Sequence, residues 1–390
     1  MDTITHGIAG ALVARSLGSR HTPQRADCGA LGTPRHEARL ATIAVTLGAV
    51  FPDSDFFAHF FSNHNLARLE LHRGVTHSFL MLPVWALLFG GITWFCTRRR
   101  WLLWSGLYGA GLALHIFLDL ITSYGTMIWA PWSNARVAWD LAFIVDLTLT
   151  GIVLLPQLMA WVYSSPEQAL RRGLIAWFVP TLVGAVAAWL AAALQIPLPV
   201  LTVVIASAGM ALLLWLPSLE GRGFRWPTAL YCRLGVMVLV VYLVLCRAAH
   251  QAALSRVEDF AQSTGSRTVR WAALPAPPSL WWWSGLVQTP EGIYRVSIRL
   301  LDPAAPSYRF FANAEKNVYL EKAEAHADVQ TFRWFARFPW VTYREESGLH
   351  VIEYRDLQFF DPPRGRTPPF TLRVFLDDQG RVVRSGLLQP

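Results

Sequence analysis

The segment Leu71-His-Arg-Gly-Val-Thr-His-Ser78 leads directly into Phe79-Leu-Met-Leu-Pro-Val-Trp-Ala-Leu-Leu-Phe-Gly-Gly-Ile-Thr-Trp-Phe-Cys96. The second part is an apolar run, and about 20 apolar residues in a helix cross a bilayer. The first part places His72 and His77 at the mouth of that run. Ionisable side chains are costly in a lipid-spanning segment and usually mark function. The stretch therefore predicts a membrane helix with a polar site at one end.

The composition divides the chain into two parts. Of 390 residues, 53% are hydrophobic and 15% charged, against about 25% charged in ordinary soluble domains. Residues 1–254 hold 17 Arg, no Lys and 11 acidic residues, whereas residues 255–390 hold 17 basic and 15 acidic residues. We expect a transmembrane metal-site domain over 1–250 and a soluble, β-rich extracytoplasmic domain over 251–390.

Apolar runs between basic loops predict a mainly α, polytopic membrane domain. Two short apolar helices are expected at 4–17 and 40–51. About six full spans follow, near 78–97, 101–122, 139–163, 173–193, 199–217 and 230–248.

Charge gives this bundle a direction. Alternate loops carry 13 Arg with four acidic residues on one side, and seven acidic residues with four Arg on the other. The positive-inside rule makes the first side cytoplasmic, so the chain is expected in a bacterial inner (cytoplasmic) membrane with its C-terminal domain outside. A reporter enzyme fused after residue 254 would test this orientation. The net charge of +8 thus reflects topology, and no nucleic-acid partner is expected.

Histidine and aspartate recur at the outer ends of these segments. His115 and Asp119 lie four apart, on one helical face; the alternative is a hydrogen-bonded structural pair. Asp53 follows an apolar run at a helix break, although a surface turn is a common setting for such residues. Asp2 and His6 also lie four apart, and for this pair the alternative is a frayed chain terminus. The predicted metal ligands are Asp2, His6, Asp53, His72, His77, His115 and Asp119.

Three further residues are candidates for catalytic roles. Arg73 carries a fork of donors suited to phosphate, or it forms an ion pair with Glu70 or with an aspartate of the site. Asp55 and Asp146 are each candidates for a base or a further ligand. Asp146 is expected about two turns inside the 139–163 span.

The donor set indicates a class of metal. Imidazole and carboxylate without thiolate suit Zn²⁺, with Mn²⁺ or Fe²⁺ as alternatives, and the number of donors is sufficient for two ions. The four cysteines show no CxxC spacing, which argues against a thiolate site. In the soluble part, strands are expected at Ile293–Leu301, Val318–Leu320, His350–Tyr354 and Phe370–Leu376. Trp281–Trp283 fit an aromatic belt or a domain core better than a substrate platform.

Four motifs together resemble a known family. Met1-Asp-Thr-Ile-Thr-His6-Gly, Pro52-Asp53-Ser-Asp55, His72-Arg-Gly-Val-Thr-His77-Ser and His115-x3-Asp119-x2-Thr122-Ser-Tyr-Gly125-Thr are similar to those of bacterial membrane-bound metal-dependent hydrolases of the YbcI/YdjM type. The resemblance covers about residues 1–150. It implies a multi-spanning inner-membrane protein whose motif residues bind metal. The arrangement is also similar to zinc-dependent phospholipase C enzymes, which favours a phosphoester substrate.

We therefore expect an integral membrane hydrolase that uses metal-activated water on a phosphoester of a lipid or lipid-linked substrate. The alternative is a non-enzymatic membrane protein, a metal-binding transport or envelope-stress factor with a structural metal site. Ionisable residues crowd one side of the predicted bundle, whereas a transport path needs them through its whole depth. This distribution favours the hydrolase.

Overall fold

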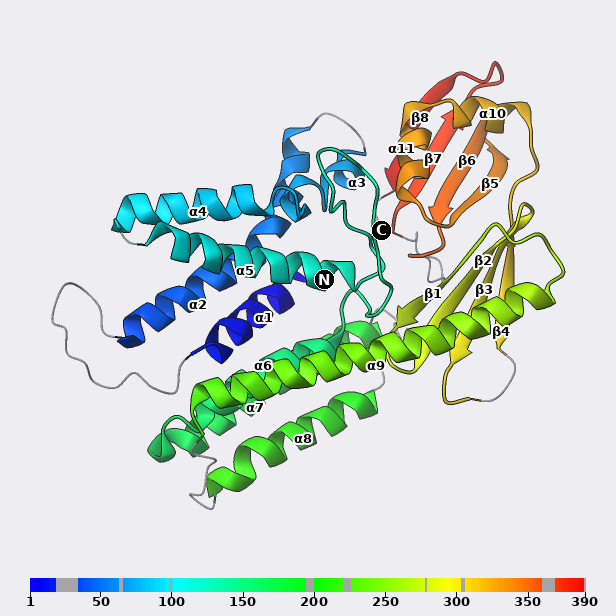
Figure 1. Cartoon of the computed structure of the whole chain (residues 1–390). Coiled ribbons are helices and arrows are strands. Elements are labelled where there is room, and N and C mark those ends of the chain that lie inside the picture. The colour runs from blue at the N-terminus through cyan, green and yellow to red at the C-terminus, as the bar shows by residue number, and fades with distance from the viewer. Residues whose placement is uncertain are drawn as a thin grey trace.

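The computed structural model describes residues 1–18, 34–62, 66–98, 100–193, 200–219, 226–277, 279–302, 306–359 and 369–388. Its N-terminal part is helical, and its C-terminal part carries two antiparallel sheets (Figure 1). The helical elements are α1 (Thr3–Ser16), α2 (Pro34–Val50), the 3-10 helix η1 (Phe51–Phe61), α3 (Ala67–Leu71), η2 (Val75–His77), α4 (Leu82–Thr97), α5 (Trp101–Leu120), α6 (Leu147–Val162), η3 (Pro166–Gln168), α7 (Ala169–Ala193), α8 (Val200–Leu219) and α9 (Thr228–Ser263).

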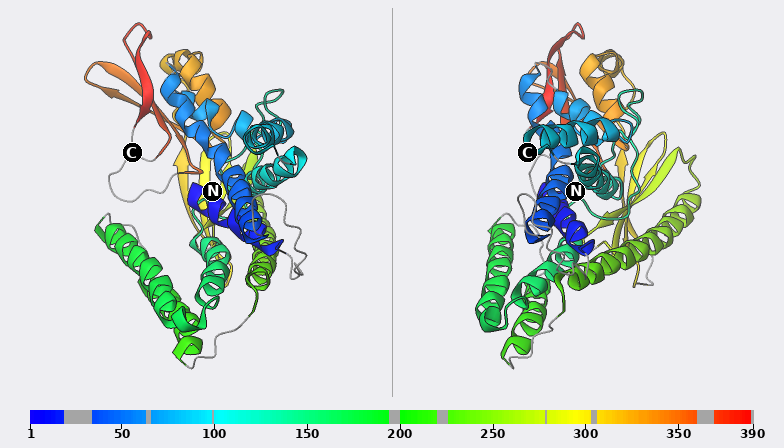
Figure 2. Two further views of the ribbon diagram at one scale, coloured as in Figure 1. Left: turned by 90° about the vertical axis from the view of Figure 1, so that its left-hand side faces the viewer. Right: turned by 60° about the vertical axis from the view of Figure 1, so that its left-hand side comes forward.

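Several helices have the length and apolar composition of membrane spans. Within the described ranges four qualify, namely His36–Ala58, Trp101–Leu120, Pro166–Val186 and Thr228–Ser263. The pair Ala67–His77 and Leu82–Thr97, bent by 70°, makes a fifth if it is counted as one span. In Figure 2, α7 and α8 stand away from the helices of the first 120 residues.

Small residues let the first helices pack backbone to backbone. A Cβ atom at Gly10 of α1 would overlap with Ala49 of α2, and one at Gly111 of α5 would overlap with the Val45 carbonyl of α2. Such close approach is typical of membrane helices, where van der Waals packing drives association. It brings together the N-terminal end of α1 and the C-terminal ends of α2 and α5, where His6, His115 and Asp119 lie.

Two helices differ in length from the prediction. The run expected to be a short helix at 40–51 is the C-terminal part of a longer α2, which η1 then continues. The segment expected to span at 139–163 is helical only over Leu147–Val162. Its first part is not helical, and there the Leu141 and Ala142 amides donate to the Ile121 carbonyl, at 2.8 and 3.0 Å. Most of the basic loop expected at 18–39 lies outside the described residues.

Each of the two sheets has four strands in sequential order. The first contains β1 (Arg270–Ala276), β2 (Trp282–Gln288), β3 (Gly292–Arg299) and β4 (Ser307–Ala312). The second contains β5 (Pro339–Glu346), β6 (Leu349–Asp356), β7 (Thr371–Leu376) and β8 (Val382–Leu388).

The long α9 joins the membrane bundle to the first sheet. At about 1.5 Å per residue, its 36 residues exceed the thickness of a bilayer core. Its C-terminal half packs Ala253 and Val257 against a core that includes Trp283. Trp283 is therefore a core residue, as expected, whereas Trp281 and Trp282 are exposed.

Helices α10 (Val318–Glu324) and α11 (Ala327–Phe335) cover one face of the second sheet. The strand expected at Val318–Leu320 is wrong, because these residues begin α10. The side chain of Asn317 accepts a hydrogen bond from the Leu320 amide at 2.8 Å and caps this helix. Asparagine is a favoured cap for helices, and three residues are too few to show a strand period.

The second sheet also packs onto the membrane part. Leu66, Leu69 and Tyr124 share one hydrophobic core with α11 and the sheet. Arg337 reaches Asp140 with two hydrogen bonds, of 2.8 and 2.9 Å. Burial alone would lower the pKa of Arg337, but the hydrogen bonds and charge of the Asp140 carboxylate outweigh burial and raise this pKa. The C-terminal part is thus tied to the loop between α5 and α6.

Candidate metal centre

Four side chains with metal-ligating atoms form a cluster in the described part of the chain. Asp53 lies in η1, His77 ends η2, and His115 and Asp119 lie one turn apart on α5. One ligand atom of each lies within 4.8 Å of the others. The cluster therefore joins three segments that the packing of α2 against α5 holds together.

Five of the six distances among these atoms are close to those expected in a tetrahedral metal site. His77 Nε2 lies 3.0 Å from His115 Nε2, 3.2 Å from Asp119 Oδ2 and 3.7 Å from Asp53 Oδ1. His115 Nε2 lies 3.5 Å from each of the same carboxylate oxygens. Ligands at 2.0–2.2 Å from a tetrahedral Zn²⁺ are about 3.3–3.6 Å apart.

Each of the two histidines has a partner on the side of its ring away from the cluster, and this partner determines which ring nitrogen faces the cluster. His115 Nδ1 lies 2.6 Å from the Ala49 carbonyl, which only accepts, so this nitrogen carries the hydrogen. His77 Nδ1 faces the Asp55 carboxylate at 3.2 Å and is protonated for the same reason. In neutral rings both Nε2 atoms then present lone pairs inward. Such outer carbonyl and carboxylate partners are typical of metal-bound histidines.

Asp119 divides its two oxygens between protein and cluster. Oδ1 faces Arg73 Nη2 at 2.9 Å and His6 Nε2 at 3.2 Å, and it accepts from the Met1 nitrogen. Oδ2 faces the cluster and is buried without a hydrogen-bond partner. Buried polar atoms are almost always partnered, so this oxygen calls for an additional positive group.

A divalent cation fits this centre. Two imidazole lone pairs and two carboxylate oxygens face one another, with no hydrogen supplied to Asp119 Oδ2. The carboxylates of Asp53, Asp55 and Asp119 outnumber the cations that contact them, which are the Arg73 guanidinium and the terminal nitrogen of Met1. A divalent ion offsets the remaining negative charge and satisfies the lone pairs, whereas unpaired buried charge is very costly.

Arg73 does not have the position of a phosphate clamp. Its side chain is 2% exposed and its Nη atoms bond Asp119 and Thr122, the latter at 3.0 Å. Its backbone has a φ of 61°, which costs energy for a residue with a Cβ. The Asp55 carboxylate stabilises this conformation by accepting from the Arg73 amide at 2.8 Å. The ion pair with a site aspartate is the alternative that the structure favours.

His6, His72 and Asp55 surround the four-atom group. The His6 ring stacks on His115 at 3.7 Å between centroids, and its Nδ1 is buried without a hydrogen-bond partner. His72 Nδ1 bonds Asp55 Oδ1 at 2.8 Å. Asp55 thereby orients His72, Arg73 and His77 without entering the group. His6 and His72 were predicted as ligands and Asp55 as a base or further ligand, but all three lie beside the group of four rather than in it.

Two predicted site residues have other roles in the structure. Asp2 caps α1, where its carboxylate accepts from the Thr5 amide and hydroxyl at 2.9 and 2.7 Å. Asp146 caps α6 and accepts from Tyr242 and Ser279, at 2.6 and 2.7 Å. Because α6 begins only at Leu147, Asp146 does not lie two turns inside a helix as expected.

Tyr124 and Arg136 cover the centre, and sequence reasoning assigned them no role. The Arg73 guanidinium lies 4.7 Å from the Tyr124 ring centroid, and Arg136 lies over the same ring at 4.8 Å. Burial raises the pKa of Tyr124, so the ring is neutral between two cations. Tyr124 lies within the motif that begins at His115, and this position could have marked it as a residue of the site. Nothing in the sequence places Arg136 beside it.

Fold and centre together define a class of protein, a polytopic helical membrane protein with a buried histidine–aspartate cluster. The chain belongs to the YdjM inner membrane protein family, whose model matches residues 1–194. This match contains the whole cluster and excludes both sheets.

A similar protein is the uncharacterized protein YfhP of Bacillus subtilis (strain 168). It is 30% identical over 150 residues, which are 37% of this chain and 42% of YfhP. The match therefore spans less than half of either protein. No solved structure matches the chain.

Proposed function

We propose that the chain is an integral inner-membrane hydrolase that uses a divalent metal to cleave a phosphoester of a lipid or lipid-linked molecule. The observation that carries this proposal is the inward-facing group of Asp53, His77, His115 and Asp119 at the end of apolar helices. These residues would hold the ion, with Zn²⁺ the best match to the donor set. When bound, the ion supplies Lewis acidity, which lowers the pKa of water and withdraws charge from a phosphoryl oxygen.

The surrounding residues would prepare the centre for this chemistry. Asp55 and the Ala49 carbonyl fix the two imidazoles with Nε2 inward. Arg73 orients Asp119, so that Oδ2 remains available. Burial of His77, His115 and Asp119 excludes bulk water, which strengthens electrostatic interactions at the site. The charge asymmetry of the loops supports an outer-leaflet position for the centre and the C-terminal sheets.

A structural metal site is the second candidate. Four protein ligands close a tetrahedron, and closed sites are usually structural, whereas catalytic sites keep an open position. Asp53 is the ligand that could open the site, because its side chain is 12% exposed while the other three are fully buried. Metal binding without hydrolysis would favour this candidate and the non-enzymatic class of membrane protein.

Hydrolysis by the full chain in lipid nanodiscs tests the proposal. Zn²⁺-, Mn²⁺- or Fe²⁺-loaded protein is assayed on dioleoyl phosphatidic acid, dioleoyl phosphatidylglycerol and a soluble nitrophenyl phosphodiester. We expect His115→Ala to lower the rate by about 10²-fold or more, because even supporting residues of metal sites are worth 10–100-fold. His250→Ala, on α9, is the matched control and should keep the wild-type rate. Wild-type protein no faster than His115→Ala on every substrate would contradict hydrolysis.

A further inference from the structure

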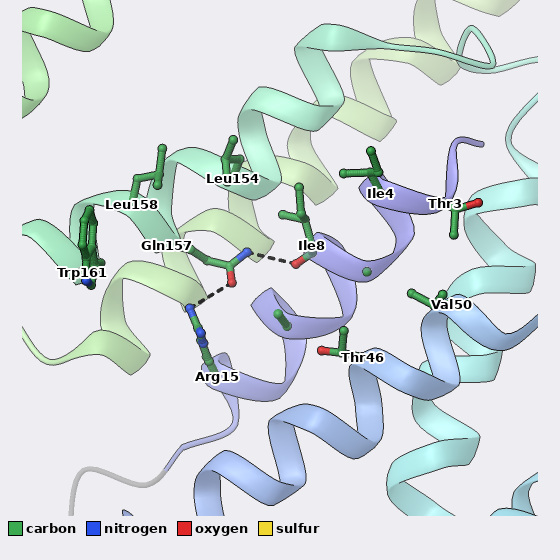
Figure 3. Close-up of a pocket in the computed structure, with 12 residues that line it drawn as sticks. Thr3, Ile4, Ile8, Arg15, Thr46, Val50, Leu154, Gln157, Leu158 and Trp161 are labelled. Carbon is green, nitrogen blue, oxygen red and sulfur yellow. Dashed lines mark hydrogen bonds between the residues drawn. The ribbon is translucent and has the colours of Figure 1, made fainter. Parts of the chain in front are cut away.

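A groove runs along α1 at the surface of the helical bundle. It lies between α1, α2 and α6 and has a volume of about 670 Å³ (Figure 3), within the range of ligand pockets. Its walls include Ile4, Ile8, Val50, Leu154, Leu158 and Trp161. Ile4 is 74% and Trp161 41% exposed, so the groove is open along the side that faces the membrane.

Polar groups lie at the two ends of the groove. At one end the Thr3 hydroxyl donates to Asp53 Oδ2 at 2.6 Å, while Oδ1 of the same carboxylate belongs to the metal centre. At the other end Arg15 donates to Gln157 at 3.2 Å, and Gln157 donates to the Ile8 carbonyl at 3.0 Å. These hydrogen bonds link α1 to α6 at the far end of the groove, where Arg15 carries a positive charge.

The length of the groove matches one lipid leaflet. Thr3 and Arg15 are twelve residues apart on α1, or about 18 Å along the helix. Half of a bilayer core measures about 15 Å. An extended acyl chain fills one leaflet, so a single chain fits between the two polar ends.

Access to the metal centre points to the same groove. His6, His77, His115 and Asp119 are fully buried, and Tyr124, Arg136 and α11 cover the side toward the sheets. Asp53 is the partly exposed member of the four-atom group, and it contacts Thr3, which lines the groove. A ligand that reaches the centre through Asp53 therefore enters at the Thr3 end.

We propose that this groove binds one fatty acyl chain of a phospholipid substrate, with the lipid's phosphoester at the Thr3–Asp53 end. This inference rests on the proposed hydrolase and specifies its substrate class. The apolar walls receive the chain from the membrane, and the Thr3 end directs the phosphate toward the centre. Arg15 and Gln157 limit the depth that the chain can reach.

Photo-crosslinking locates the chain independently of hydrolysis. The full protein in nanodiscs is labelled with phosphatidic acid that carries a diazirine on one acyl chain, and the labelled peptides are identified by mass spectrometry. We expect labels to concentrate on α1 and α6. Ala11→Phe and Leu158→Trp fill the groove from opposite walls, and each should lower this labelling by about fivefold or more. Leu87→Phe, on the exposed face of α4 and away from the groove, is the control and should leave labelling unchanged.

Further readouts separate the two proposals. Metal content and melting temperature identify any variant that fails to fold. Because two variants fill the same groove, the conclusion does not rest on one of them alone. Labels spread evenly over all lipid-facing helices, or unchanged by both variants, would overturn the acyl-chain site even if the lipid is hydrolysed. Groove labelling without hydrolysis of the same lipid would contradict the hydrolase and leave the acyl-chain site in place.

Discussion

Asp55 supports the centre from outside the group of four. Its oxygens bond His72, the Arg73 amide and the Thr76 hydroxyl, at 2.8, 2.8 and 3.1 Å, and face His77 Nδ1 at 3.2 Å. It therefore fixes both the tautomer of His77 and the strained backbone at Arg73. This kind of support determines how well a ligand is oriented.

Replacement of Asp55 by Asn should weaken metal binding without removing a ligand. We expect about a 10–100-fold rise in the dissociation constant, because an amide orients the His77 ring less strongly than a carboxylate. Competition with a chromophoric chelator measures this constant. Asp2→Asn is the matched control, since Asn also caps helices, and should retain wild-type affinity. Equal affinities for Asp55→Asn and wild type would contradict the orienting role.

Single residues also show the limits of sequence reasoning at this site. His77, His115 and Asp119 could be predicted, because ionisable groups in apolar segments need a partner. The roles of His72 and Arg73 could not, because they depend on a backbone φ of 61° at Arg73. Asp146 was predicted to lie about two turns inside a helix, but the helix begins one residue after it.

At the scale of elements, apolar composition predicted helices better than it predicted their ends. The first part of the 139–163 segment is as apolar as a span, but the 121–122 segment offers it hydrogen-bond partners in an extended conformation. Tertiary pairing of this kind has no local signal in sequence. Strands β3, β6 and β7 were predicted because their alternation or β-branched content is strong; the short Val318–Leu320 run was not distinctive.

Strand β6 carries a buried charge that predicts a response to pH. Glu353 is 1% exposed and forms ion pairs with Arg344, Arg355 and Arg373. Burial alone would raise the pKa of Glu353, but the three arginines outweigh it and hold this pKa below the usual 4.5. A carboxyl group with a lower pKa in the folded state stabilises the fold above pH 4.5, and this stabilisation is lost as the pH falls through the folded pKa.

Glu353→Gln should remove that dependence. We expect a loss of about 1–2 kcal/mol of stability at pH 7, because hydrogen bonds to charged groups are worth roughly 1.5–3 kcal/mol and the arginines are partly exposed to solvent. Thermal unfolding of the full chain in detergent, from pH 7 down to pH 3, measures the difference. The gap between the two proteins should narrow toward pH 3. A gap that stays constant would show that ionisation of Glu353 contributes nothing.

At the scale of the whole molecule, the C-terminal part lies over the candidate metal centre. Tyr124 connects them: it belongs to the core of the second sheet and contacts Arg73, which bonds Asp119. The separation of a membrane part from a β-rich part was predictable from charge. Their contact through Asp140 and Arg337 was not, because the partners are 197 positions apart and lie in different regions of the sequence.

The central claim is that Asp53, His77, His115 and Asp119 bind a divalent metal ion. Metal analysis of the purified full chain, beside a His77→Ala, His115→Ala double variant, tests this claim most directly. Thermal melting confirms that the variant is folded, and His250→Ala controls for histidine loss elsewhere. We expect at least one equivalent of metal in wild type and His250→Ala, and almost none in the double variant. The same sub-stoichiometric metal in all three proteins would contradict the assignment.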